Sequence, residues 1–134
     1  MATIVTQLSV HMENRPGALA ELTGELVDAG VNIQAVSVPD TGEFGTVRLL
    51  TDKVQQAREA LDEAGHAYAA VDVLEVELPD RPGVLMEMAR ILADNNITIR
   101  YAYATISSGA ASGLCILRVD DIHRAKEILT LKLT

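Results

Sequence analysis

Aromatic side chains are scarce in this 134-residue chain, which has one Phe, three Tyr and no Trp. Proteins that bind single-stranded nucleic acid stack bases on aromatic side chains, so a base-stacking surface is not expected. Basic residues are also in the minority, with 11 Lys and Arg against 19 Asp and Glu and a formal net charge of −8. This charge repels nucleic acid and anionic membrane surfaces. The composition therefore predicts neither a nucleic-acid nor a membrane partner.

Cysteine and long apolar runs are lacking as well. The single cysteine, Cys115, cannot form an intrachain disulfide, which fits a reducing compartment. No segment approaches the roughly 20 apolar residues of a membrane span, and the first residues have no signal-peptide pattern. Hydrophobic residues nevertheless make up 49% of the chain, enough for a folded core. We expect a soluble cytoplasmic protein.

A repeated turn is the most informative feature that is present. Asn14–Gly17 reads Asn-Arg-Pro-Gly, and sixty-six positions later Asp80–Gly83 reads Asp-Arg-Pro-Gly. Each copy follows an alternating apolar run, typical of a strand, and precedes apolar residues at helical spacing. Proline suits the first helical position, and the free N–H groups of a helix start favour small anions. The repeat predicts a duplicated module, with one copy in residues 1–72 and the other in residues 73–134. It also predicts a ligand near each turn.

The apolar pattern of the first copy predicts the order βαββαβ. Its predicted strands are 4–12, 31–38, 46–51 and 67–71. The two predicted helices carry apolar stripes at Leu19, Leu22, Leu26 and Val27, and at Val54, Ala57, Ala60 and Leu61. Gly30 is expected to end the first helix in a left-handed conformation. Asp52 is expected to cap the second helix, with Gln55 at the capping-box position, and Gly65 to end it.

The second copy repeats this order up to its last helix. Strands are predicted at 73–78 and 97–101, with helical stripes at Leu85, Met88, Ile91 and Leu92, and at Ile122, Ala125, Ile128 and Leu129. Asn96 stands where Gly30 stood and predicts the same left-handed turn. The small-residue loop 107–113 is two residues longer than its counterpart, so the offset becomes sixty-eight and Asp120 is the expected cap of the last helix.

The end of the second copy is shorter than that of the first. Thr130–Thr134 suits either a short strand or a continuation of the last helix. The second sheet is therefore expected to lack a full last strand, which leaves an edge that another chain covers. The predicted fold class is α+β, with two ferredoxin-like modules in tandem, antiparallel sheets and helices on one face.

The turns and their flanks resemble a known family. Met12–Leu19 followed by Gly30–Ile33 looks like the ACT domain, and is especially similar to the regulatory domain of D-3-phosphoglycerate dehydrogenases. Asp80–Leu85 with Ile97–Ile99 is similar but looser, and together the copies cover nearly the whole chain. The resemblance implies a non-catalytic regulatory module, expected as a homodimer. Such a module binds an amino acid at the interface of paired domains and modulates a partner enzyme or regulator.

The resemblance also indicates which residues touch the ligand. Asn14 and Asn32 match asparagines that hold serine in the dehydrogenase-type domains, while Asp80 and Thr98 replace them in the second copy. A histidine of the family falls at Met12; His11, one residue off, points to the other strand face, which argues against serine. We expect recognition mainly in the first copy, or at one composite interface site. The candidate ligand-binding residues are Asn14, Arg15, Pro16, Gly17, Ala18, Leu19, Asn32, Asp80, Gly83 and Val84.

Other functions find little support in the sequence. His11, His66 and His123 lie on different predicted elements without metal-ligand spacing, so neither a metal site nor a cofactor is expected. No nucleophile–base pair is present, and we expect no catalytic residues. Arg15 and Arg81 are interpreted either as solvated loop residues, or as a carboxylate clamp or an intersubunit contact. The alternative function is a structural or interaction subunit without a working ligand site. The few aromatic and many small residues suggest a small pocket and a small amino acid as its ligand.

Overall fold

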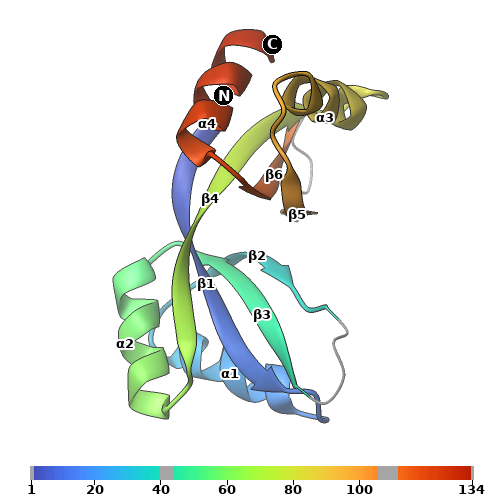
Figure 1. Ribbon diagram of the computed structural model, residues 1–134. Helices are drawn as coiled ribbons and strands as arrows, with labels where there is room; N and C mark the ends of the chain where they lie inside the picture. The colour runs from blue at the N-terminus through green and yellow to red at the C-terminus, as the bar shows by residue number, and fades with distance from the viewer. Residues whose placement is uncertain (1, 40–43, 106–111, 134) are drawn as a thin grey trace. The chain divides into compact units, whose positions relative to one another are not determined.

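The chain folds into two compact units. The computed structural model describes residues 2–39, 44–105 and 112–133. One unit, here the N-terminal module, is Thr6–Val71; the other, the C-terminal module, combines the described residues up to Val5 with those from Asp72 onward. Each contains strands and two helices (Figure 1). No helix among the described residues has the length and apolarity needed to cross a membrane.

The N-terminal module has the predicted βαββαβ order. Its elements are β1 (Ala2–Glu13), α1 (Ala18–Asp28), β2 (Ile33–Ser37), β3 (Phe44–Thr51), α2 (Val54–Ala64) and β4 (Tyr68–Pro79). β3 pairs antiparallel with both β1 and β2, and the strand order is β2-β3-β1-β4. This is the ferredoxin-like topology, so the predicted fold class is confirmed for this copy.

The C-terminal module repeats the topology with one substitution. It contains part of β4, then α3 (Val84–Asp94), β5 (Ile99–Ala104), β6 (Ser112–Val119) and α4 (Ile122–Lys132). β6 pairs antiparallel with β4 and β5, and the strand order is β1-β4-β6-β5. The position that β4 holds in the first copy is therefore taken here by the beginning of β1.

Two long strands, β1 and β4, contribute residues to the sheets of both modules. β4 is one strand of 12 residues where the sequence predicted two separate strands, and β1 also has 12 residues. Ala2 is buried in the core of the C-terminal module, and Ile4 packs against that core. The second copy lacks a last strand of its own, as expected, but the edge is not left for another chain, because the described residues up to Val5 cover it. The chain after Leu129 continues as helix through Lys132, and Thr134 lies outside the described residues.

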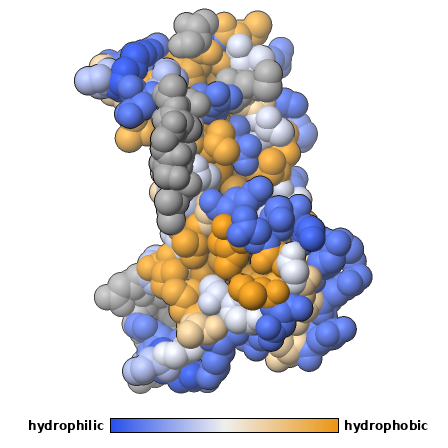
Figure 2. All heavy atoms as spheres, turned by 180° about the vertical axis from the view of Figure 1, so that it is seen from behind, coloured by the Kyte–Doolittle hydropathy of each residue, from blue (hydrophilic) through white to orange (hydrophobic). Residues whose placement is uncertain are grey.

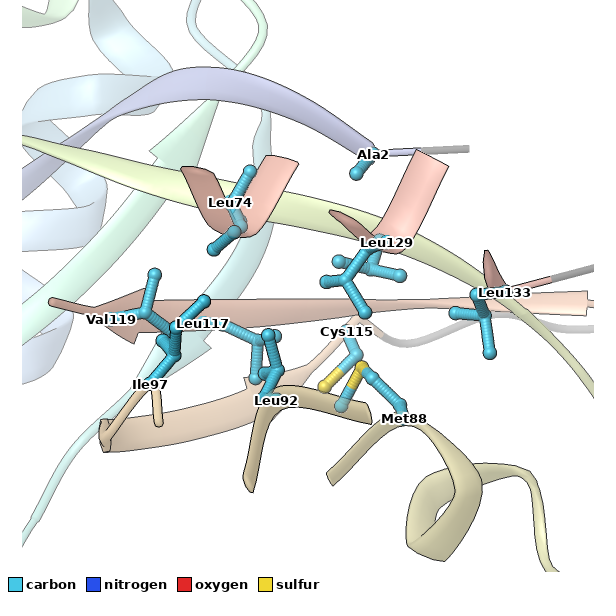
Figure 3. Packing of buried hydrophobic residues seen from close by; sticks show 12 residues of the cluster. Ala2, Leu74, Met88, Leu92, Ile97, Cys115, Leu117, Val119, Leu129 and Leu133 are labelled. Atoms are coloured by element: carbon cyan, nitrogen blue, oxygen red, sulfur yellow. The ribbon is translucent and has the colours of Figure 1, made fainter. Parts of the chain in front are cut away.

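Each module has its own apolar core beneath its helices. The core of the N-terminal module comprises Leu8, Val10, Leu22, Leu26, Val31, Val47, Leu49, Ala57 and Leu61. The core of the C-terminal module includes Leu74, Val76, Met88, Leu92, Leu117, Ala125 and Leu129, and Figure 3 shows Ala2 and Leu129 within this cluster. The predicted stripes are thus mostly confirmed.

Three residues of the predicted stripes lie outside these cores. Leu19, Val27 and Leu85 are exposed, at 38%, 68% and 58%. In α1 the buried positions are Ala18, Leu22 and Leu26, a spacing of four that leaves Leu19 and Val27 beside the stripe. Figure 2 shows hydrophobic surface beside hydrophilic surface on one face of the molecule. Leu19 and Leu85 occupy equivalent positions, so an apolar side chain is exposed at the start of both α1 and α3.

The turns after the first helix of each copy match the prediction. Gly30 has φ 76° and Asn96 has φ 62°, so both adopt the left-handed conformation. Asn tolerates this region better than other residues with a side chain. The equivalence of the two copies therefore extends to the backbone of this turn.

The expected helix caps are wrong. α2 and α4 start after Lys53 and Asp121, and neither helix has a side-chain cap. The Asp52 carboxylate accepts the N–H of Asn32 at 2.9 Å instead, and the Asp120 carboxylate accepts two hydrogen bonds from Arg100 at 3.0 and 2.9 Å. The bond with Asp120 raises the pKa of Arg100.

Candidate ligand sites at the two turns

The Arg-Pro-Gly turns have the same backbone conformation in both copies. Gly17 has φ 84° and ψ −11°, and Gly83 has φ 89° and ψ −7°. Only glycine adopts this left-handed region readily. The first helical N–H groups, of Ala18 and Val84, donate to the carbonyls of Arg15 and Arg81. Neither α1 nor α3 receives a side-chain cap, so the next N–H groups of the first turn keep donor capacity for a ligand. The turn therefore presents the same uncapped helix start twice.

Each turn is braced by an arginine that bonds to its own helix. Arg15 donates to Glu21 at 2.7 Å and to Glu13 at 3.2 Å, and Arg81 donates to Glu87 at 2.9 Å. The hydrogen bond with Glu21 raises the pKa of Arg15 and lowers the pKa of that carboxyl group. Both arginines are half exposed, but their charge is already compensated within the module. The interpretation as solvated loop residues agrees with this exposure, and each arginine is in addition held by an ion pair to its own helix.

Asn14 borders a small hollow in the N-terminal module. The hollow has a volume of about 20 Å³ and is lined by Met12, Asn14, Val38, Pro39, Gly45, Thr46 and Val47. One water molecule needs about 10–15 Å³ of such cavity volume, so this space alone does not hold an amino acid. Arg15, Pro16, Gly17 and Leu19 are exposed next to it on the turn, and Ala18 is buried.

The structure does not bring Asn14 and Asn32 together within the module. β1 is aligned with β3 so that Met12 lies opposite Gly45, whereas β2 starts with Ile33 opposite Thr51. Six residues of β3 separate these two levels, which is about 20 Å at 3.3 Å per residue. The idea that Asn32 lies beside the Asn14 turn is wrong, because α1 carries the chain back to the other end of the sheet.

The C-terminal module has a much larger hollow at the equivalent turn. Its volume is about 470 Å³, within the range of small-molecule sites. Asp80 and Val84 line it, as the sequence analysis proposed, while Gly83 is exposed beside it. The other described lining residues are Leu78, Pro79, Leu85, Ala102, Tyr103, Ala104, Thr105, Gly113, Leu114 and Cys115.

Most of these lining residues were not among the candidates predicted from the sequence. The missed residues lie at the facing ends of β5 and β6, which the antiparallel register brings beside the end of β4. The repeat contained the signal that identifies them: Val38 and Pro39 border the first hollow, and their equivalents Ala104 and Thr105 border the second. Residues 107–111 of the predicted small-residue loop, and residues 40–43 between the second and third strands, lie outside the described residues.

Neither His11 nor His66 lines these two hollows. His11 lines a third hollow of about 440 Å³ together with Ser9, Thr46 and Tyr68, on the strand face opposite Val10. His66 bonds to Glu25 on α1. Among the described residues, no group of three or more His, Cys, Asp or Glu side chains is arranged to hold a metal ion.

Comparisons with known proteins agree with this architecture. A family model described as an ACT domain pair matches residues 3–134. The ACT domain-containing protein ACR3 of Arabidopsis thaliana is 28% identical over 87% of this chain, which spans 31% of that relative's length. Protein BT0572 of Bacteroides thetaiotaomicron is 26% identical, with a TM-score of 0.90 over 98% of this chain and 90% of that one. The regulatory subunit of aspartate kinase from Thermus thermophilus is 15% identical, with a TM-score of 0.68 over 99% of this chain and 97% of that one.

Proposed function

Because the chain belongs to the ACT domain pair family, we propose that it is a non-catalytic regulatory module that binds an amino acid beside its Arg-Pro-Gly turns. The observation that carries this proposal is the identical left-handed glycine at two uncapped helix starts, each beside a hollow at the strand ends. A zwitterion needs donors for its carboxylate and acceptors for its ammonium group. First-turn N–H groups supply the donors, and Asn14 or Asp80 supplies the acceptor.

A site that uses both asparagines requires a second copy of the chain. Asn14 and Asn32 are about 20 Å apart along one module, too far for one small amino acid to touch both. Two copies that meet with their β2 edge strands antiparallel would place Asn14 of one beside Asn32 of the other, twice by symmetry. β2 is the last strand in its order, and Val36 and Val38 are exposed at 38% and 49%. We therefore propose a homodimer with composite sites.

For the regulated partner we propose only a class, namely an enzyme or regulator of amino-acid metabolism. An alternative is an interaction subunit whose N-terminal module has lost ligand binding. The 20 Å³ hollow beside Asn14 favours this alternative for that module.

A thermal-shift panel of the twenty amino acids tests the proposal. An amino acid that binds only the folded chain raises the melting temperature once its concentration is well above its Kd. At least one amino acid is expected to do so at millimolar concentration. Asn14→Ala is expected to weaken binding about tenfold, the effect of losing one or two hydrogen bonds.

Thr98→Ala is the matched control for this panel, since Thr98 is exposed and takes the place of the second asparagine in the other copy. It should leave a shift that depends on Asn14 and Asn32 unchanged. If no amino acid shifts the melting temperature at these concentrations, the interaction subunit becomes the better description.

A further inference from the structure

We propose that the hollow of the C-terminal module binds an apolar ligand that carries an ammonium group, an aliphatic amino acid or amine, in contrast to the N-terminal module. This inference rests on the proposed function and deepens it, because it assigns a ligand class to one of the two turns. The two hollows occupy equivalent positions in the repeat, so each difference between them is a difference between matched residues.

Size is the first difference between the hollows. Val38 and Val47 border the small hollow, and their equivalents Ala104 and Cys115 border the large one. Both replacements reduce the volume of the side chain, and the hollows have volumes of about 20 and 470 Å³. The larger space accommodates a branched aliphatic chain together with its polar end.

The chemistry of the walls is the second difference. Thr46 in the first hollow is replaced by Leu114 in the second, and Leu78, Val84 and Leu85 add further aliphatic wall. The hydroxyl of Thr105 is engaged, because it accepts the N–H of Leu114 at 3.3 Å. The Cys115 side chain points toward Met88 (Figure 3), and burial raises the pKa of its thiol, so it stays neutral. These walls favour an apolar group.

Asp80 is the one charged residue among the described residues that line the large hollow. The neighbouring Arg81 donates to Glu87 at 2.9 Å, and no ion pair within the described part of the chain neutralises Asp80. In the first hollow the neutral Asn14 holds this position. A carboxylate at the rim of an apolar hollow attracts an ammonium group, and the net charge of −8 favours the approach of a cation.

Isothermal titration of the full chain with three leucine-related compounds tests the inference. L-leucine and isopentylamine both carry the ammonium group, whereas 4-methylpentanoate keeps the carboxylate and lacks it. We expect the first two to bind and 4-methylpentanoate to bind at least about tenfold more weakly. The Asp80→Asn variant should weaken isopentylamine binding by about tenfold, since it removes the charge and keeps the shape.

Two further variants separate the site from general effects. Asp94→Asn removes an exposed carboxylate at the end of α3, outside the hollow, and should leave binding unchanged. Ala104→Val with Cys115→Val restores the residues of the first hollow and should abolish isopentylamine binding. The inference is overturned if isopentylamine binds wild type and Asp80→Asn equally, if 4-methylpentanoate binds best, or if neither ammonium compound binds.

Failure of this inference is distinguishable from failure of the proposed function. If a polar amino acid raises the melting temperature in a manner that depends on Asn14, while leucine and isopentylamine do not bind, the regulatory proposal stands and the ligand class assigned to the second hollow falls. If no amino acid binds anywhere but isopentylamine binds through Asp80, the second hollow is an amine site and the regulatory proposal loses its support.

Discussion

Deletion of residues 2–5 is expected to lower the free energy of unfolding of the C-terminal module by about 3 kcal/mol or more. Ala2 is 4% exposed within that module's core, and Ile4 packs against it. Their removal exposes apolar surface and also leaves the edge of β4 without its neighbour, at about 1 kcal/mol for each lost hydrogen bond. Amide hydrogen exchange should show lost protection in α3 and α4, while α1 and α2 remain protected.

A matched pair of point variants checks this effect without shortening the chain. Ile4→Ser removes a partly buried side chain and should reduce stability, whereas Thr3→Ser alters its exposed neighbour and should change little. Equal protection of both modules after the deletion would show that the start of β1 does not complete the C-terminal sheet.

Gly17→Val and Gly83→Val should each cost about 2 kcal/mol of stability, because a β-branched residue is strained at φ 84° or 89°. A Cβ at either position meets no atom within 4 Å, so the cost is conformational and not steric contact. Urea unfolding of each variant measures it, with midpoints compared at equal m-values.

Gly24→Ala is the control for the glycine variants. Gly24 lies inside α1, has no positive φ, and a Cβ there also meets nothing within 4 Å. Alanine at this helical position should stabilise the chain by about 0.5–1 kcal/mol. If valine at Gly17 and Gly83 is as well tolerated as alanine at Gly24, the left-handed turn is not needed for the fold.

The sequence predicted those parts of the fold that depend on local pattern. The repeated turn, the buried stripes, the order of strands and helices along the first copy and the left-handed Asn96 follow from periodicity and from the conformational preferences of glycine and asparagine. The shared use of β1 and β4 does not follow, because alternation marks a strand without naming its neighbours. The role of Ala2 in a core formed largely by residues after Asp72 is a long-range pairing of this kind.

The candidate sites show the same difference between features that depend on local residues and features that depend on long-range pairing. The turns at Gly17 and Gly83 were identified because their residue types act locally. The separation of Asn14 from Asn32 needed the strand register, since residues 18 positions apart are joined by a helix that reverses direction. Ala104 and Cys115 are small residues that line the second hollow. Their sequence alone does not show this, because it does not place β5 and β6 beside α3.

The most direct measurement of the central claim is a nitrogen-15 NMR titration of the chain with the amino acid that gives the largest thermal shift. If the Arg-Pro-Gly turns bind the ligand, the amide resonances of Gly17 and Ala18, or of Gly83 and Val84, should move with ligand concentration. Gly65, a left-handed glycine at the end of α2, is the internal reference and should not move. Movement confined to residues away from both turns, with their amides unchanged at saturation, would contradict the account.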